Sequence, residues 1–335
     1  MDLKTAIVIL NWNGEKFLKQ FLPGVIQHSK KWASIVVADN ASTDGSIEYL
    51  KSLGEEVSII QLDKNYGFTG GYNRALQQIK SEYYVLLNSD VEVTENWLNP
   101  VIEYLDQHQG VGIAQPKILA YHNRTYFEYA GAAGGYIDWM GYPFCRGRLF
   151  NSLEEDKGQY DDIKEVFWAT GACMFIRAEL YHQLQGLDEN FFAHMEEIDL
   201  CWRAQLAGQK VVVIPNSKVF HVGGGTLPKN NPRKTFYNFR NNLMMLYKNL
   251  PASKRGWVII LRLLLDGVAG VKFLVEGHLK DTLAVLKAHF SFYEMVLNGK
   301  AHKSKIKNQM VSGIYNDSIL WGYFIKGIRQ FNRLK

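Results

Sequence analysis

The chain has 335 residues, 47% of them hydrophobic, and a formal net charge of +5. This length and composition suffice for a buried core without covalent cross-links, in one large domain or two smaller ones. The three cysteines form no C-x-x-C pair and have no histidine at zinc-ligand spacing, which argues against a disulfide framework or a structural zinc site and for reduced core thiols.

The two ends of the chain differ in charge. Near the N-terminus the apolar run 6–10 is too short for a signal peptide, so we expect a cytoplasmic protein. From Pro251 onward there are 14 Lys and Arg against 5 Asp and Glu, a net charge of +9, whereas residues 1–250 have a net charge of −4. A basic segment can bind nucleic acid or anionic lipid, and the interleaved Leu, Val and Phe favour lipid.

The first 90 residues alternate short apolar runs with amphipathic stretches. We predict strands at 6–10, 35–38, 57–60 and 83–87, separated by helices near 15–28, 43–53 and 70–80. This βαβ series implies a parallel sheet with right-handed crossovers, and ligands of such sheets bind beyond the carboxyl ends of the strands. Polar segments follow the predicted strands at 11–13, 39–46, 63–65 and 88–90.

The segment 39–46 places the carboxylate of Asp39 where a strand turns into a helix capped by Ser42 or Thr43. This carboxylate can accept the imide N–H of a uracil or thymine ring, with added positive potential from the helix N-terminus. An ordinary capped turn is the alternative, and the position after the second parallel strand favours base binding.

The loop 65–75 bears several glycines and enters a helix, so its backbone can approach a phosphate or ribose while Arg74 offers charge-assisted hydrogen bonds. It is not a G-x-G-x-x-G motif after the first strand, and no G-K-[ST] follows it. A Rossmann-type oxidoreductase and a P-loop protein are therefore disfavoured.

Asn88, Ser89 and Asp90 follow the fourth predicted strand. Asp90 can hold a hard divalent cation together with substrate phosphates, although such a sequence also forms simple turns. Farther along, His221 ends an apolar run and precedes Gly223–Gly225. It is either a satisfied core histidine or a second ligand for the metal held by Asp90.

Residues 110–220 look less regular. We expect a loop-rich acceptor region at 129–147, a helix at 196–206 ended by Gly208, and a strand at 211–214. Glu196 and Glu197 fall in the first turn of that helix, either as helix-dipole partners or, kept ionised there, as a general base. Asp199 is expected to support the helix or to pair with Arg203.

The stretch 257–290 is apolar but interrupted by charges, so no run approaches the roughly 20 residues needed to cross a bilayer. Aromatic residues beside Lys and Arg suit helices that lie in a membrane interface. They are Trp257, Phe273, Phe290, Phe292 and Tyr293. The alternative is a helical domain packed on the rest of the chain.

Taken in order, these elements resemble glycosyltransferase family 2, in particular its rhamnosyltransferase-like members, over about residues 4–245. The resemblance rests on the segments 39–46, 65–75, 88–90, 171–177, 196–203, 221–225 and 237–241. It implies an α/β fold of GT-A type, Rossmann-like, with a mainly parallel central sheet. The catalytic domain would be 1–250, with a nucleotide-sugar-binding region at 1–110 and an acceptor-binding region at 111–250, followed by a basic amphipathic helical region at 251–335.

The resemblance also implies roles for matching residues. Asp39 would contact the donor base, Asp90 and His221 would bind Mg²⁺ or Mn²⁺, and Glu197, or its neighbour Glu196, would be the catalytic base. The remaining donor-binding positions would be Asn11, Asn40, Asn65, Gly71, Asn73, Arg74, Asn88 and Ser89, and the acceptor positions Trp168, Thr170, Gly171, Ala172 and Arg240, with Trp168 as a sugar-stacking surface. The D-x-D pattern of many family members appears here as Asn88–Asp90, with one carboxylate, and the base position holds Glu instead of the commoner Asp.

These roles imply a metal-dependent inverting hexosyltransferase that uses a dTDP- or UDP-sugar, with rhamnose as the first candidate. The acceptor would be a lipid-linked or growing polysaccharide of a bacterial surface glycan, met at the inner face of the cytoplasmic membrane. An anionic membrane surface is an expected partner, nucleic acid is not, and a homo-oligomer stays open. The alternative is an inactive nucleotide-sugar-binding or scaffold subunit of a glycan assembly complex, against which the presence of Glu197 and His221 argues.

Overall fold

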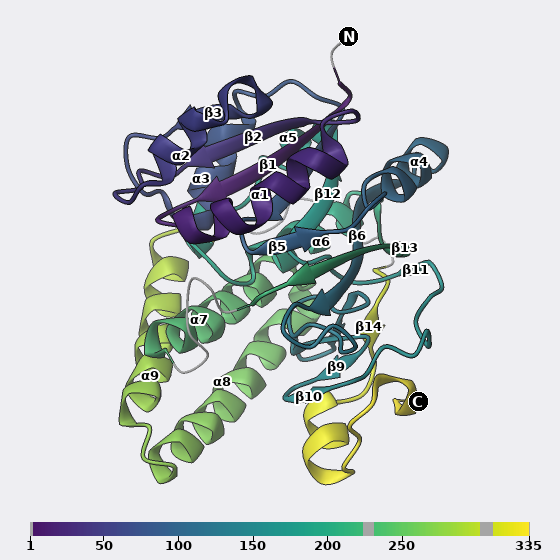
Figure 1. Ribbon diagram of the computed structural model, residues 1–335. Helices are drawn as coiled ribbons and strands as arrows, with labels where there is room; N and C mark the ends of the chain where they lie inside the picture. Colours follow the sequence, from purple (N-terminus) through teal and green to yellow (C-terminus); the bar gives the residue numbers. More distant parts are fainter. Residues whose placement is uncertain (1–2, 224–230, 302–310, 335) are drawn as a thin grey trace.

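The computed structural model describes residues 3–223, 231–301 and 311–334 (Figure 1). A central mixed sheet has the strand order β11-β13-β6-β12-β4-β1-β2-β3, and β5 pairs with β13. The strands are β1 (Thr5–Asn11), β2 (Ser34–Asp39), β3 (Ser58–Gln61), β4 (Tyr83–Asn88), β5 (Val91–Val93), β6 (Val111–Ala120), β11 (Lys164–Glu165), β12 (Cys173–Arg177) and β13 (Lys210–His221).

The predicted βαβ series at the start of the chain is confirmed. Strands β1, β2, β3 and β4 are parallel neighbours, linked by α1 (Glu15–Ser29), α2 (Ser46–Ser52) and α3 (Gly67–Leu76). Alternate residues of β1 enter the cores on opposite faces of the sheet: Val8 packs with one core cluster, and Ile7 and Ile9 with the other. Both faces are therefore covered, as in α/β proteins.

The second half of the sheet departs from the parallel pattern. β12 runs antiparallel between β4 and β6, and β13 then returns parallel to β6. The strand predicted at 211–214 extends to His221 through an irregularity between Ile214 and Lys218. Around this half lie α4 (Asn99–Gln107), α5 (Ala178–Gln183), a 3₁₀ turn at Glu189–Phe191 and the predicted helix α6 (Glu196–Leu206).

The region 129–147, expected to be rich in loops, forms part of a second sheet of short strands. Its order is β10-β9-β8-β7-β14, made by β7 (Gly135–Asp138), β8 (Pro143–Cys145), β9 (Arg148–Leu149), β10 (Ser152–Leu153) and β14 (Ile314–Tyr315). Because β14 comes from the end of the chain, residues 314–315 pair with β7, and Ile319 and Tyr323 join the core of this second sheet. The region expected at 251–335 is thus divided between two places.

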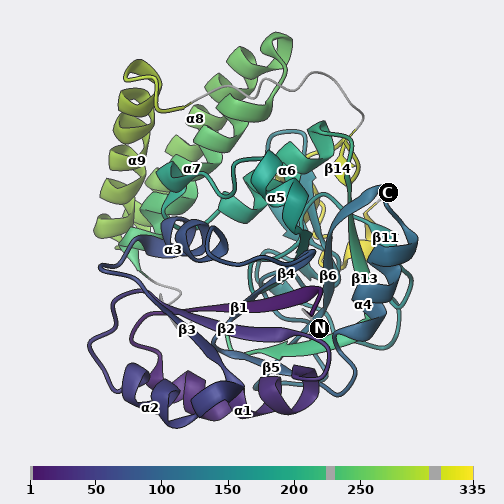
Figure 2. The ribbon, with the colours of Figure 1, turned by 90° about the horizontal axis from the view of Figure 1, so that it is seen from above.

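Three long helices lie together beyond one end of the central sheet (Figures 1 and 2). They are α7 (Pro232–Asn249), α8 (Ala252–Val275) and α9 (Leu279–Leu297). None of the helices in the described parts of the chain is long and apolar enough to cross a membrane. The helices pack on the rest of the protein, since Arg262 of α8 donates to the carbonyl of Met140 at 2.9 Å. Of the expected interface aromatics, Phe292 is buried and Phe273 half-buried, whereas Trp257, Phe290 and Tyr293 are exposed.

Candidate active site

The carboxyl ends of β1 and β2 carry a hydrogen-bonded carboxylate. Asn11 and Asp39 are register partners, and Asn11 Nδ2 donates to Asp39 Oδ1 at 3.0 Å and to Ser42 Oγ at 3.1 Å. The other Asp39 oxygen accepts from the backbone N–H of Ser42 at 2.9 Å, and Asp39 is only 3% exposed. The loop is built to hold Asp39 in one orientation at the edge where the sequence predicted a ligand.

The cap of α2 differs from the prediction. Neither Ser42 nor Thr43 caps this helix. The N-cap residue is Gly45, and Asp44 before it accepts from the N–H of Ser46 through Oδ1 at 3.1 Å and from the N–H of Glu15 through Oδ2 at 3.0 Å. Burial alone would raise the pKa of Asp44, but these hydrogen bonds outweigh it and hold the pKa below the usual value. The turn therefore binds the starts of α1 and α2 together.

Asn40 and Asn65 fix the loop that leads into α3. Asn40 donates to the carbonyl of Gly67 at 3.0 Å and to Asn65 Oδ1 at 3.1 Å, and it accepts from the N–H of Tyr66 at 2.9 Å. Gly71 is needed for close packing, since a Cβ there would lie 2.7 Å from Leu10 Cδ1. These predicted donor-binding positions therefore shape the loop, and their side-chain groups are engaged within the protein.

Arg74 and Asn73 are placed differently from the prediction. Arg74 lies 2.8 Å from Glu189 Oε1, donates to the carbonyl of Gly70, and stacks with its guanidinium carbon 3.7 Å from the centre of the Tyr66 ring. Asn73 accepts from the Tyr181 hydroxyl at 2.6 Å and from the N–H of Leu187, and donates to the Leu187 carbonyl. In this structure their polar groups tie α3 to the segment ahead of α6, and their predicted role as phosphate or ribose ligands stays a prediction.

Asp90 and His221 meet at the junction of β5 and β13. His221 Nε2 lies 3.2 Å from Asp90 Oδ1, and both side chains are buried. The other ring nitrogen, Nδ1, lies 3.4 Å from Oε2 of Glu128, a buried residue that the sequence did not single out. Burial would lower the pKa of His221, but the carboxylates of Asp90 and Glu128 beside the ring prevail and raise the pKa to about 10. His221 would bind a metal as the neutral imidazole, with the ion taking the place of the Nε2 proton.

This arrangement fits the chemistry of a divalent-metal site. A carboxylate oxygen and an imidazole nitrogen lie within ligand reach of one another, and a carboxylate against the remote ring nitrogen is the usual support of a metal-binding histidine. The described residues contain no group of three or more His, Cys, Asp or Glu placed to hold a metal. Asp90 and His221 would thus supply two ligands, and phosphate oxygens and water the rest. Gly224 and Gly225 of the predicted glycine-rich loop lie outside the described residues.

The acidic pair begins α6 directly after Met195, whose backbone is left-handed with φ of 71°. One carboxylate oxygen of Glu196 and one of Glu197 are buried without a hydrogen-bond partner in the described structure. Burial raises the pKa of Glu197 to about 7, and burial together with repulsion from Glu197 raises the pKa of Glu196. For Glu197, burial thus outweighs the backbone N–H groups at the start of α6, which favour the ionised form.

A short segment, Ala169–Ala172, connects the acidic pair to the sheet edge. A Cβ at Gly171 would lie 3.8 Å from Glu197 Cβ, and the Ala172 carbonyl accepts from the N–H of Asn88 at 2.9 Å. On the other side, Ser89 Oγ would lie 3.6 Å from a Cβ at Gly14, in the loop after β1. Gly171 thus lies close to Glu197, and the next residue bonds the end of β4.

Three of the predicted acceptor residues face inward. Trp168 is 4% exposed, its indole covers Gly135 and its Nε1 donates to the Tyr136 carbonyl at 3.0 Å, so it has no free face on which a sugar could stack. Thr170 is buried, and its hydroxyl accepts from the Ala172 N–H at 3.2 Å. Arg240 donates to the carbonyls of Asn190 and Phe191 at 2.9 and 3.1 Å, which makes it a brace for the loop before α6.

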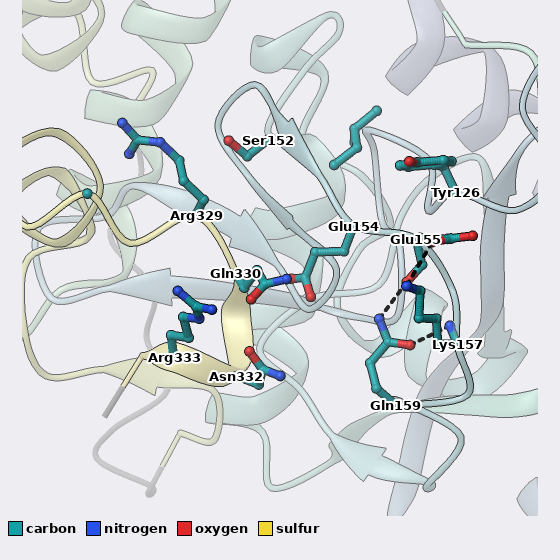
Figure 3. Close-up of a pocket in the computed structure, with 12 residues that line it drawn as sticks. Tyr126, Ser152, Glu154, Glu155, Lys157, Gln159, Arg329, Gln330, Asn332 and Arg333 are labelled. Carbon is teal, nitrogen blue, oxygen red and sulfur yellow. Dashed lines mark hydrogen bonds and ion pairs between the residues drawn. The ribbon is translucent and has the colours of Figure 1, made fainter.

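A cavity of about 590 Å³ lies elsewhere, between β10 and the C-terminal segment (Figure 3). None of the predicted site residues lines it. One of its two carboxylates, that of Glu154, accepts from the Phe331 N–H at 2.8 Å and from the Tyr160 hydroxyl at 2.9 Å, so it anchors the end of the chain. We therefore place the candidate active site at the sheet edge and not in this cavity.

Comparison with known proteins adds independent information. The family model of glycosyl transferase family 2 matches residues 6–184. The chain is 22% identical over 230 residues to an N-acetylglucosaminyl-diphospho-decaprenol L-rhamnosyltransferase of Mycobacterium tuberculosis, covering 64% of this chain and 75% of that protein.

Two solved structures are similar in fold. Residues 1–349 of S. aureus TarS in complex with UDP-GlcNAc match with a TM-score of 0.59 at 16% identity, covering 88% of this chain and 82% of that one. GalNAc-T7 with UDP, GalNAc and Mn²⁺ matches with a TM-score of 0.58 at 18% identity, covering 73% of this chain and 47% of that one.

Proposed function

The chain belongs to glycosyl transferase family 2, and from this premise we propose that it transfers a sugar from a nucleoside-diphosphate sugar to a glycan acceptor with inversion at the anomeric carbon. The observation that carries the proposal is the 3.2 Å approach of His221 to Asp90, from distant parts of the chain, at the edge that also holds Asp39. Asp39 would accept the imide N–H of the donor base.

Asp90 and His221 would hold Mg²⁺ or Mn²⁺, and this ion, when bound, supplies charge stabilisation for the departing diphosphate. Support comes from the pairing of these residues and from the Mn²⁺ in the structure of GalNAc-T7, a protein of similar fold. Glu128 would keep the His221 ring oriented through Nδ1.

Glu197 would act as the general base. Its carboxylate would take the proton of the acceptor hydroxyl while that oxygen forms a bond to the anomeric carbon, and the bond from this carbon to the diphosphate oxygen breaks with its electron pair leaving on the diphosphate. A pKa of about 7 is well matched to this task, because the group is ionised in part at neutral pH and still basic enough to hold a proton. Glu196, with its raised pKa and deeper burial, would stay protonated beside it.

We propose rhamnose as the first donor sugar and a lipid-linked diphosphate glycan, met at a membrane surface, as the acceptor. The name of the mycobacterial relative supports both choices, and the UDP-GlcNAc complex of the TarS fragment makes UDP-sugars the second donor class to test. Surface glycan assembly on the cytoplasmic side of a membrane would be the setting.

The proposal is tested by thermal stabilisation with dTDP-rhamnose and UDP-sugars, each with and without Mg²⁺ or Mn²⁺, followed by transfer to a polyprenyl-diphosphate-linked acceptor. A productive donor should raise Tm only in the presence of a divalent ion. NMR of the product should show an anomeric configuration opposite to that of the donor sugar. A retained configuration would contradict the single displacement, and turnover unaffected by chelation would contradict the metal.

A further inference from the structure

The two C-terminal helices α8 and α9 expose an unusual number of large apolar side chains. On α8 they are Trp257, Ile260, Leu264, Val268, Val271, Leu274 and Val275, and on α9 Leu279, Leu283, Leu286, Phe290, Tyr293 and Leu297, with exposures between 44% and 85%. Apart from Leu274 they recur every three or four residues, so each helix carries one continuous outward stripe. The opposite side of α8 is buried and holds Arg262 and Asp266, whereas the opposite side of α9 buries apolar residues such as Ala288 and Phe292.

Contacts between the helices fix the two stripes side by side. Thr282 of α9 donates to the Gly270 carbonyl of α8 at 3.0 Å, and His289 Nε2 lies 3.4 Å from Asp266 Oδ2. Asp266 is in turn paired with Arg262, which also contacts α7 through Asn242. The views of Figures 1 and 2 agree that α8 and α9 lie alongside each other, away from the central sheet. The stripes therefore form one face, which we call the hairpin face.

Charged residues border the hairpin face and do not interrupt it. With about 100° of rotation per residue, Lys254 and Lys272 lie on the side of the α8 stripe away from α9. Lys280 and Lys287 lie correspondingly on the far side of the α9 stripe. Two exposed acids, Glu276 and Glu294, share these edges, and Glu276 pairs with Lys272 at 2.8 Å. The border is therefore basic on balance, with these four lysines against two acids.

We propose that the hairpin face is a docking surface for an anionic lipid bilayer, with both helices lying parallel to the membrane plane. An apolar band flanked by lysines matches acyl chains flanked by phosphate head groups. A second copy of the chain, placed face to face, would instead bring two basic borders together. Trp257 and Tyr293 add side chains that favour the interface between water and hydrocarbon.

This inference rests on the proposed function in one respect: a lipid-linked acceptor would lie in the same bilayer. Lying helices also agree with the absence of a membrane-crossing helix among the described residues. At 1.5 Å per residue, α8 would cover about 36 Å of membrane surface. Docking would therefore hold the catalytic domain at the surface without a membrane anchor among those helices.

The test is co-sedimentation of the full chain with vesicles of phosphatidylcholine, with and without phosphatidylglycerol, in the absence of donor and acceptor. We expect binding to the anionic vesicles. The double variant Leu264→Gln/Leu286→Gln should weaken it at least tenfold, because both side chains would lose their place in the acyl region. Lys280→Gln/Lys287→Gln should weaken binding to anionic vesicles by roughly fivefold per lysine and leave binding to neutral vesicles unchanged.

A matched control is Trp32→Gln/Ile163→Gln, which removes two exposed apolar side chains far from the hairpin face; it should bind as the unchanged protein does. Transfer to a water-soluble acceptor should be the same in all four proteins. Failure of the wild-type protein to bind anionic vesicles would overturn the proposal. So would a dimer, detected by sedimentation velocity, that dissociates in the Leu264→Gln/Leu286→Gln variant. Because vesicle binding is measured without turnover, the protein can fail to bind vesicles and still be an active transferase. It can equally bind vesicles and prove inactive as a transferase.

Discussion

Asn241 of α7 donates a hydrogen bond to the backbone carbonyl of His194 at 2.7 Å, directly ahead of the acidic pair. The same amide group also reaches the carbonyls of Phe191 and Ala193, at 3.0 and 2.8 Å. Within this loop the φ angles of Phe192, His194 and Met195 are 64°, 69° and 71°. Non-glycine residues in this region are strained, so a buried side chain that binds three carbonyls is what holds the loop in place.

Replacing Asn241 with Ala should therefore misplace Glu197. We expect kcat to fall at least tenfold with less than a twofold change in donor KM, and the free energy of unfolding to fall by about 1–3 kcal/mol because buried carbonyls lose their partner. Steady-state kinetics and thermal unfolding measure the two effects. Asn242→Ala is the matched control, since Asn242 is equally buried on α7 but bonds Gly141 and Arg262 instead. If both variants lose kcat alike, Asn241 has no positioning role.

Glu197→Gln should abolish most of the chemistry and spare donor binding. Because Gln cannot accept the acceptor proton, we expect kcat to drop by about 10²–10⁴ while the Kd of the donor stays within twofold. Glu196→Gln serves as the companion variant, and it should retain most of the activity because that group is expected to be protonated already. Calorimetry and steady-state rates separate the cases. A larger loss in Glu196→Gln would move the base to that residue.

The pH dependence follows from the raised pKa of Glu197. Activity should rise with pH and level off above about 7, where burial has shifted the pKa of the carboxyl. Between about pH 4.5, the ordinary value, and 7, the folded chain binds more protons than the unfolded chain, so this group makes the protein less stable as pH rises. The gain in Tm of Glu197→Gln over wild type should grow from pH 5 to pH 8. A difference in Tm between the two proteins that does not change with pH would show that the pKa of the Glu197 carboxyl is not shifted.

Asp90→Asn should weaken the binding of the metal and of the donor together. We expect the stabilisation by Mn²⁺ plus donor to disappear, and kcat/KM to fall by at least a hundredfold, because an amide is a far poorer ligand for a hard cation than a carboxylate. Differential scanning fluorimetry with and without Mn²⁺ tests this. Glu92→Gln, in β5 two residues farther along but paired with Arg124 at the surface, is the control and should behave as wild type. Undiminished Mn²⁺ stabilisation in Asp90→Asn would place the ion elsewhere.

Arg74 and Glu189 should act as a structural pair. We expect Arg74→Gln and Glu189→Gln to lower stability by similar, small amounts of up to about 1 kcal/mol, since the pair is partly exposed, with a double variant no worse than either. Donor KM should be unchanged in all three. Thermal unfolding and donor titration give the double-mutant cycle. A donor KM raised tenfold by Arg74→Gln alone would restore the phosphate-binding role.

The first half of the fold could be predicted from the sequence because its signals are local. Strands β1, β2 and β4 are largely apolar runs that end in Asn or Asp, and the helices α1 and α3 each have an apolar side. The observed bounds of β1, β2 and β4 extend the predicted ones by one residue at most at each end. The pairing of Asp199 with Arg203 at 2.7 Å is likewise a local property of one helix turn.

The rest depends on partners that are distant in sequence. The direction of β12 is set by β4 and β6, and strands of two residues such as β9 and β10 are too short to show a period. Trp168 looks like a sugar-stacking residue until Gly135, from another strand, is found against its ring. Nothing in the sequence singles out Glu128, and its contact with His221 becomes apparent only in the fold. The raised pKa of Glu197 could likewise not be predicted from the sequence, because the burial that causes it is a property of the fold.

The antiparallel strand β12 also has a consequence for synthesis of the chain on the ribosome. β4 hydrogen-bonds to β1 on one edge and to β12 on the other. The strands β1 to β4 are therefore translated while the edge of β4 that faces β12 still has no partner. Until residues 173–177 emerge, a row of backbone amides and carbonyls on β4 is open to pairing with other nascent chains. The time of translation between β4 and β12 thus sets how long that edge stays unpaired.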